Sequence, residues 1–375
     1  MAAPKTLAFL SLAGIALAQD PESKDWPLFR GSPDMRGVAK EVISAPLELA
    51  WSTEIGRSVM ATPVIAGGRV YVGAEDGQFR CLNLEDGKVI WSYEAADTIE
   101  GSACVAGDLV CFGSGDGLLH ALDRSSGEVK WTYQTDGEIL GGANFYQSSA
   151  DNKSYVLIGS YDNHLHCVDL ANGALKWKYE TDNYVNGAPG VHEGRIYFGG
   201  CDAQVYGVDA ETGKTVSSMD AGHVITNTIV VADGIAYVAH YDNRVAAFDL
   251  AEKKLLWEFG ERDFPFLASP AVNAESVFAG GKDKRLYRIN RKDGTAVWEF
   301  KTGGGIESSP VVTGSTVFVG SGDGTLYAID LKGGEENWSY EIGDSLRSSP
   351  AIASGMLVIG CDDGKVYAFR AAEKD

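Results

Sequence analysis

Eight aspartates recur along the sequence, each between two short apolar segments. A carboxylate in such a position could bind either a metal ion or backbone amides. The aspartates are Asp76, Asp116, Asp162, Asp202, Asp242, Asp283, Asp323 and Asp363. A calcium loop needs several oxygen ligands that converge from alternate positions, whereas each segment supplies one aspartate. Asp-Gly and Asp-Asn between apolar strands are typical of tight hairpins, in which the carboxylate accepts local N–H groups. We therefore expect these aspartates to build turns.

Histidine and cysteine are the other residue types that could do chemistry here. The six histidines are separated in the sequence, and we predict no metal site; His120 and His166 are expected in the core or between repeats. The segment SACVAGDLVCF predicts a two-residue hairpin that places Cys104 opposite Cys111, within reach of a disulfide. The alternative is that both are small apolar side chains of the core.

A repeat of about 40 residues positions all of these side chains. Seven of the eight tryptophans stand in one column, with Ser217 in its single gap, and the steps along the column are 40, 40, 46, 40, 40, 41 and 40 residues. The column consists of Trp51, Trp91, Trp131, Trp177, Trp257, Trp298 and Trp338. We expect these tryptophans to pack structurally between repeats.

Each repeat reads as four short strands separated by turns, which predicts an all-β, eight-bladed β-propeller. The last repeat ends after its third strand, and the segment LELAWSTEI, which contains Trp51, supplies a spare fourth strand near the N-terminus. We therefore expect this strand to complete the last blade and close the ring.

The most informative positions are those at which the repeats differ. An apolar residue precedes each innermost strand, and the next position varies: Met60, Glu100, Leu140, Asn186, Thr226, Leu267, Glu307 and Arg347. These residues are expected to ring one mouth of the central channel. Glu100, Asn186, Thr226, Glu307 and Arg347 are the candidate ligand-binding residues. The alternative is a solvated Glu307–Arg347 ion pair, with water around the others.

The turns that lead into the tryptophans resemble a known motif. NLEDGKVIW, DRSSGEVKW, DLANGALKW and DLKGGEENW resemble the tryptophan-docking motif of pyrroloquinoline-quinone (PQQ)-type propellers, and the resemblance covers essentially all of the chain after residue 18. Within this family the chain is similar to the non-catalytic, BamB-like outer-membrane assembly proteins. It departs from the motif at Ser217 and in the turn at Glu252-Lys253, which lacks glycine.

The resemblance implies two functions. The first is a protein-interaction scaffold that binds other envelope or secreted proteins and needs no cofactor. The second is a quinoprotein dehydrogenase that oxidises an alcohol or sugar, with PQQ and calcium at the channel mouth. Regular repeat steps leave little chain for a cofactor lid, and the adjacent cysteine pair of many such alcohol dehydrogenases is missing. We therefore favour the scaffold and assign no catalytic residue.

Composition and the N-terminal segment bear on location and partners. Residues 1–18 predict a cleaved signal peptide with a small-residue end at Ala16-Leu17-Ala18, followed by an extension over 19–46 and the propeller over 47–375. No cysteine follows the cleavage position, so we expect an exported, periplasmic or secreted monomer without a lipid anchor. The net charge of -20 argues against nucleic acid as a partner, and no later segment is apolar enough to span a membrane.

Overall fold

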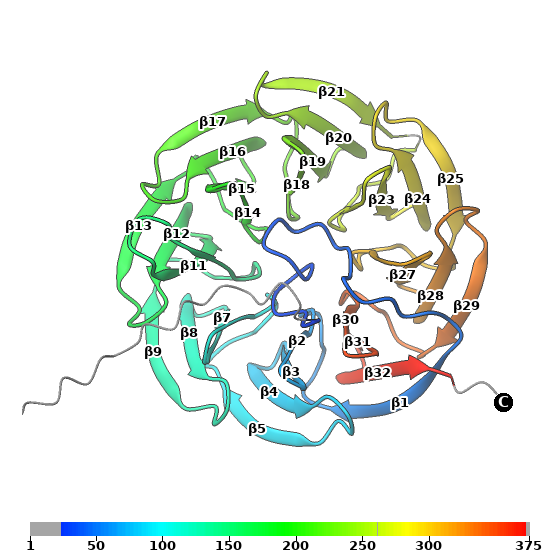
Figure 1. Cartoon of the computed structure of the whole chain (residues 1–375), viewed down its shortest axis with the longest axis horizontal. Coiled ribbons are helices and arrows are strands. Elements are labelled where there is room, and N and C mark those ends of the chain that lie inside the picture. Colours follow the sequence, from blue (N-terminus) through cyan, green and yellow to red (C-terminus); the bar gives the residue numbers. More distant parts are fainter. Residues whose placement is uncertain (1–23, 261, 373–375) are drawn as a thin grey trace, which may run out of the picture.

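Eight four-stranded antiparallel sheets stand around a central axis like the blades of a propeller (Figure 1). The computed structural model describes residues 24–260 and 262–372, so the predicted signal peptide lies outside the described residues. The described residues form 32 strands and no helix, and thus none that could cross a membrane. The predicted fold is confirmed.

The strands of each blade run outward from the channel. The innermost strands are β2 (Val64–Ala66), β6 (Cys104–Ala106), β10 (Asn144–Gln147), β14 (Gly190–His192), β18 (Val230–Ala232), β22 (Ala271–Val272), β26 (Val311–Thr313) and β30 (Ala351–Ala353). The second strands are β3 (Arg69–Gly73), β7 (Leu109–Gly113), β11 (Ser154–Ser160), β15 (Arg195–Gly199), β19 (Ile235–His240), β23 (Ser276–Gly281), β27 (Thr316–Gly320) and β31 (Met356–Gly360). Their side chains are buried almost throughout, because blades cover both faces.

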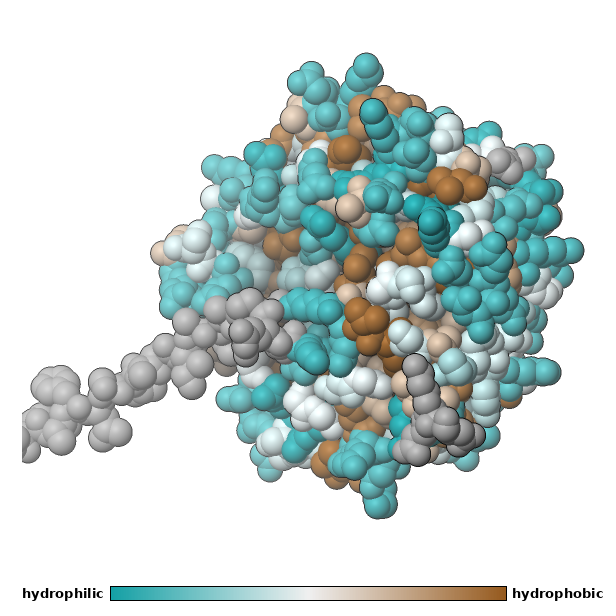
Figure 2. Space-filling model, turned by 45° about the vertical axis from the view of Figure 1, so that its right-hand side comes forward, coloured by the Kyte–Doolittle hydropathy of each residue, from teal (hydrophilic) through white to brown (hydrophobic). Residues whose placement is uncertain are grey.

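The outer half of each blade is more exposed. The third strands are β4 (Gln78–Asn83), β8 (Leu118–Asp123), β12 (His164–Asp169), β16 (Gln204–Asp209), β20 (Arg244–Asp249), β24 (Arg285–Asn290), β28 (Thr325–Asp330) and β32 (Lys365–Ala371). The outermost strands are β5 (Val89–Glu94), β9 (Val129–Gln134), β13 (Leu175–Glu180), β17 (Thr215–Asp220), β21 (Lys254–Phe259), β25 (Ala296–Lys301), β29 (Glu336–Glu341) and β1 (Leu47–Glu54). Hydrophilic side chains dominate the surface in Figure 2, with hydrophobic ones in small groups between them.

The eighth blade joins the two ends of the described chain. Its sheet has the order β1-β32-β31-β30, and Trp51 of β1 lies opposite Ala368 of β32. The predicted closure by an N-terminal strand is therefore confirmed. Closure pairs the first described strand with the last. The ring of blades is therefore closed where the two ends of the described chain meet.

The tryptophan column docks each blade onto the next. Six indole N–H groups donate to backbone carbonyls about 33 to 39 residues ahead, at 2.8–3.1 Å: Trp51, Trp91, Trp131, Trp177, Trp257 and Trp298. Under each ring lies a glycine with positive φ, such as Gly294 under Trp257. Trp338 forms no such bond among the described residues, since β32 and β1 of the next blade are not joined by a docking turn.

The two departures from the motif explain each other. Ser217 stands 36 residues before Lys253, the spacing that separates the docking tryptophan from the glycine under its ring in four of the other blades. Lys253 keeps the positive φ of 51°. Without an indole above it, the turn has no ring for a Cβ to meet, so the glycine is not required there.

The recurring aspartates build turns, as expected. Their Oδ1 atoms accept the N–H two residues on at 3.0–3.1 Å, as Asp162, Asp202, Asp323 and Asp363 do. The residue four positions on, which is a tyrosine in four blades, donates its hydroxyl to the same carboxylate: Tyr206 to Asp202, Tyr287 to Asp283, Tyr327 to Asp323 and Tyr367 to Asp363. Each of these carboxylates is thereby held by its own hairpin.

Residues 26–39 cross one end of the channel (the blue segment over the centre of Figure 1) and are called the plug below. Trp26 and Val38 form β-bridges with Ile65 and Val312. Further around the ring, the plug carbonyls of Pro27, Pro33 and Arg36 accept backbone N–H groups from three innermost strands at 2.7–2.9 Å. The sequence predicted an extension here but not that it would cover the channel.

Candidate functional site at the channel mouth

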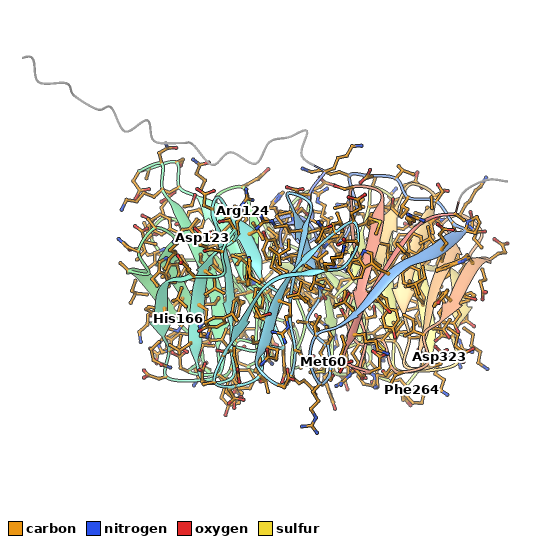
Figure 3. The ribbon with its side chains drawn as sticks, turned by 90° about the horizontal axis from the view of Figure 1, so that it is seen from below. Met60, Asp123, Arg124, His166, Phe264 and Asp323 are labelled. Atoms are coloured by element: carbon orange, nitrogen blue, oxygen red, sulfur yellow. The ribbon has the colours of Figure 1, made fainter. Side chains whose placement is uncertain are left out.

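The variable residues lie at the end of the channel away from the plug, and all of them line one cavity. All eight, from Met60 to Arg347, border a space of about 190 Å³. Figure 3 shows Met60 on the same face as the hairpin aspartate Asp323, opposite the face that carries Asp123 and Arg124. Phe29 of the plug also lines the cavity, so side chains from the mouth and from the plug enclose one space.

The two cations at the mouth are each held by carboxylates. Arg347 donates from Nε to Asp362 at 2.7 Å and lies 3.6 Å from Glu75, and Lys282 forms a short ion pair with Glu307. The alternative of a Glu307–Arg347 pair is therefore wrong: each residue pairs with a side chain of a hairpin turn instead. Sequence spacing could not show this, because the partners lie 15 and 25 residues away on other loops.

Glu100 has no ion pair or hydrogen bond within the described part of the chain, although it lines the same cavity. Burial is the largest cause of a raised pKa of its carboxyl, and the negative charges of Glu75 and Glu138 add to this, while Arg347 opposes it. The mouth thus has an excess of negative charge.

Two asparagines at the cavity wall present unused acceptors. Asn186 donates from Nδ2 to Cys201 Sγ at 3.0 Å, and Asn227 donates to the carbonyl of Phe266 at 3.2 Å. Their Oδ1 atoms are buried and have no hydrogen-bond partner among the described residues. Together with Glu100, these oxygens make the cavity suited to a cation or a hydrogen-bond donor.

Three exposed aromatic side chains lie on the mouth face, one in a hairpin of blade five and two in the loops that lead into blades four and six. Tyr184, Tyr241 and Phe264 are 44%, 58% and 50% exposed, and we call them the aromatic arc. The backbone carbonyl of Tyr184 and the amide of Tyr241 hold these loops to adjacent turns, and Figure 3 places Phe264 on the face that carries Met60. None of the three was predicted from the sequence; the available signal was at Tyr241, which directly precedes the hairpin aspartate Asp242.

The remaining candidates lie away from the mouth. Cys104 and Cys111 are register partners, as the hairpin predicted, and both are fully buried free thiols; their oxidation to a disulfide stays a prediction. The six histidines are not all separate, as was expected from the sequence, because His164 and His166 alternate on β12 and share one face.

Comparisons with known proteins agree with this architecture. The sequence matches the family described as outer membrane protein assembly factor BamB over residues 44–147, 141–216, 201–308 and 285–374. No curated protein sequence matches. The structure of BamB from Moraxella catarrhalis is similar with a TM-score of 0.73 at 20% identity, covering 88% of this chain and 99% of that one.

Quinoprotein structures are equally similar in fold. A quinohemoprotein alcohol dehydrogenase from Comamonas testosteroni has a TM-score of 0.78 at 16% identity, covering 94% of this chain and 82% of that one. The enzyme ADHIIG from Pseudomonas putida HK5 has a TM-score of 0.79 at 15% identity, with coverage of 94% and 81%. At such identities the likeness shows the fold alone.

Proposed function

This chain belongs to the BamB-like family of PQQ-type propellers, and we propose that it is an exported, non-catalytic scaffold that binds another envelope or secreted protein through its mouth face. The aromatic arc is the observation that carries the proposal. Aromatic side chains are enriched where proteins bind one another, and here Tyr184, Tyr241 and Phe264 are exposed in a hairpin and two neighbouring inter-blade loops.

The charge at the mouth supports the same surface. Glu100 is unpaired within the described chain and its carboxyl has a raised pKa, so a basic group from a partner would relieve the repulsion from Glu75. Aromatic contacts would then supply the apolar part of the interface, and the acidic mouth would orient the partner. Because the N-terminal segment predicts export, we expect the partner to lie outside the cytoplasm.

The experiment compares capture by matched variants of the exported protein. Wild-type protein, the double variant Tyr241→Ser/Phe264→Ser and the control Val129→Ser are used to capture proteins from the native envelope, with quantitative mass spectrometry. Val129 is a suitable control because it is 47% exposed on the outer strand β9. We expect a defined partner to be retained by wild type and control and lost by the double variant; equal retention by all three would refute the mouth-face proposal.

The alternative is a quinoprotein dehydrogenase with PQQ and calcium at the mouth, which the fold of the enzymes above favours. PQQ is a planar tricarboxylate and needs cations and a flat stacking surface. Among the described residues that line the cavity, Arg347 is the one cation and is paired with Asp362, and Phe29 is the one aromatic residue. The residues present do not fit this group, and we assign no reaction step to it.

The test of the alternative is direct. Purified protein is mixed with PQQ and Ca²⁺, bound quinone is measured by absorbance after gel filtration, and dye reduction is followed with alcohols and sugars. We expect neither stoichiometric binding nor turnover. Stoichiometric quinone with substrate-dependent dye reduction would establish the dehydrogenase and overturn the scaffold.

A further inference from the structure

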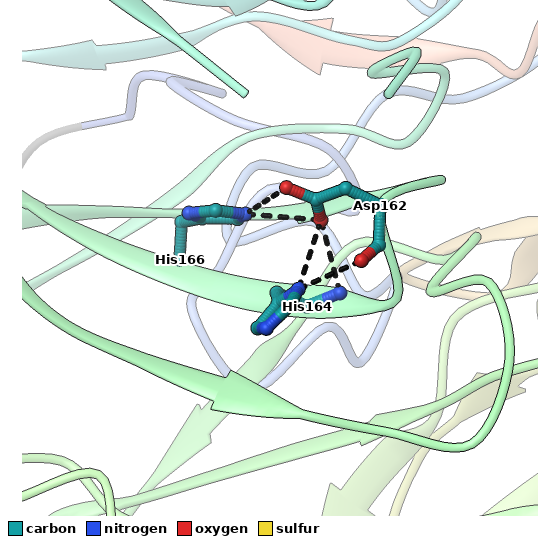
Figure 4. A group of neighbouring side chains, drawn as sticks. All are labelled: Asp162, His164 and His166. Carbon is teal, nitrogen blue, oxygen red and sulfur yellow. Dashed lines mark hydrogen bonds and ion pairs between the residues drawn. The ribbon is translucent and has the colours of Figure 1, made fainter. Parts of the chain in front are cut away.

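Blade three carries a cluster of metal-binding side chains outside the channel mouth. It consists of Asp162 in the hairpin between β11 and β12, and of His164 and His166 on β12 (Figure 4). His166 Nε2 lies 3.0 Å from Asp162 Oδ2, and His164 Nδ1 lies 3.4 Å from Asp162 Oδ1. One potential ligand atom from each residue lies within 4.8 Å of the other two.

These separations suit a zinc ion. Zinc binds histidine nitrogen and carboxylate oxygen at about 2.0 to 2.2 Å in tetrahedral geometry, so two of its ligand atoms are about 3.3 Å apart. Measured to the same carboxylate oxygen, Asp162 Oδ1, the separations are 3.2 Å for His166 Nε2 and 3.4 Å for His164 Nδ1, which lie on either side of that value. Two imidazoles and one carboxylate leave a fourth position for water, and His164, 19% exposed, borders the solvent.

A second shell is also in place. The hydroxyl of Tyr133 lies 3.0 Å from Nδ1 of His166, the nitrogen that faces away from Asp162. A histidine ligand commonly donates its other N–H to an oxygen, which fixes the ring and its tautomer. With Nε2 free of its proton, His166 would carry the proton on Nδ1 and donate it to Tyr133.

The other blades show which part of this cluster the fold itself requires. In four blades a tyrosine stands where blade three has His166, and its hydroxyl holds the hairpin aspartate, as Tyr206 holds Asp202 at 2.7 Å. An aspartate–aromatic contact is thus a structural part of the repeat. Blade two has His120 at this position, but Leu118 replaces His164. Blade three alone combines the aspartate with two histidines, and the second one is not needed for the hairpin.

We propose that Asp162, His164 and His166 bind a divalent transition metal ion, with zinc as its representative. Binding requires unprotonated Nδ1 on His164 and unprotonated Nε2 on His166. The ion therefore replaces the contact of His164 Nδ1 with the carbonyl of Asp162, now 2.7 Å long, and the contact of His166 with the carboxylate. Imidazole ligands distinguish this site from a calcium site, since calcium selects oxygen.

The other blades show which substitutions remove a metal-binding side chain while keeping a residue that the fold already accepts at that position. His166→Tyr introduces the residue of four other blades, and Tyr133 would then face it as Tyr179 faces Tyr206, with ring centroids 5.5 Å apart. His164→Gln removes the other imidazole and introduces the residue at the matching position of blade four, Gln204. The control is His223→Gln, because His223 pairs with Asp242 at 2.9 Å but has no place in a three-ligand cluster.

The measurement is zinc binding by untagged, chelator-treated protein. Isothermal titration with Zn²⁺, and metal analysis after dialysis, should give one equivalent for wild type and for His223→Gln. His166→Tyr and His164→Gln should each weaken binding at least about tenfold, while circular dichroism and the melting temperature without metal stay close to those of wild type. Ca²⁺ should not compete.

Three outcomes would overturn the proposal. They are no zinc binding by wild type, equal affinity in His164→Gln and wild type, or competition by Ca²⁺ at equal concentration. Should His166→Tyr fold poorly, His164→Gln decides alone, because the side chain of His164 is partly exposed and two other blades have glutamine at this position. None of these results depends on whether the mouth face binds a protein.

Discussion

Replacing a docking glycine by alanine tests how tryptophan holds neighbouring blades together. Gly294 has a φ of 74°, and a Cβ there would lie 2.8 Å from two ring carbons of Trp257. Gly234 has nearly the same φ, 76°, with nothing within 4 Å of the Cβ position. The two substitutions therefore impose the same backbone strain, and only Gly294→Ala adds a clash with the indole.

The expected free energies follow from these contacts. Positive φ costs an alanine about 1 to 2 kcal/mol, which is the whole effect at Gly234. At Gly294 the ring of Trp257 must also move, losing its 3.0 Å hydrogen bond to the carbonyl of Arg291, about 1 kcal/mol. It also loses part of a packing contribution whose ceiling is about 3 to 5 kcal/mol for complete removal of a tryptophan. We expect Gly294→Ala to be less stable than Gly234→Ala by about 2 kcal/mol.

Equilibrium urea unfolding of the two variants measures this difference, provided that the slope of the transition is unchanged. A Trp257→Ala background is the control, since Gly294→Ala should there cost no more than Gly234→Ala. Equal destabilisation by the two substitutions in the wild-type background would refute the docking account.

Three further predictions follow from the described contacts. Ser217→Trp should be stabilising only together with Lys253→Gly, with a coupling of about 1 to 3 kcal/mol in a double-mutant cycle of urea unfolding; additive effects would contradict it. Because the folded pKa of Glu100 is raised, its charge destabilises the fold above the ordinary glutamate range and costs nothing below it. Glu100→Gln should therefore raise the melting temperature at pH 7 but not near pH 3, whereas a gain at both pH values would show a cause other than charge. Export through an oxidising compartment should yield a Cys104–Cys111 disulfide, seen as a linked peptide in non-reducing mass mapping; quantitative alkylation of both thiols without reductant would exclude it.

The repeat made the fold and its turns predictable, because each position is represented eight times in one sequence. The hairpin aspartates and the tryptophan column could be assigned to structure for this reason. The same comparison located the channel mouth, where the repeats disagree, and all eight variable residues do line one cavity.

Contacts between elements far apart in the chain could not be predicted in this way. Periodicity contains no information on which lysine Glu307 meets, and Lys282 reaches it from a hairpin 25 residues earlier. The plug is not part of the repeat at all, and its carbonyls accept backbone N–H groups from the innermost strands of five blades. That His164 and His166 share one face of a strand could have been predicted from their spacing of two residues. That the side chain of Asp162 lies beside them depends on the conformation of the hairpin turn.

Site-specific photocrosslinking in the producing cell tests the central claim, that the mouth face binds a protein, most directly. A photoreactive residue is placed at Tyr241, at Phe264 or at the control position Val129. The account predicts that positions 241 and 264 crosslink to the same exported protein and that position 129 does not. Crosslinks from position 129 alone, or none from either mouth position, would contradict it.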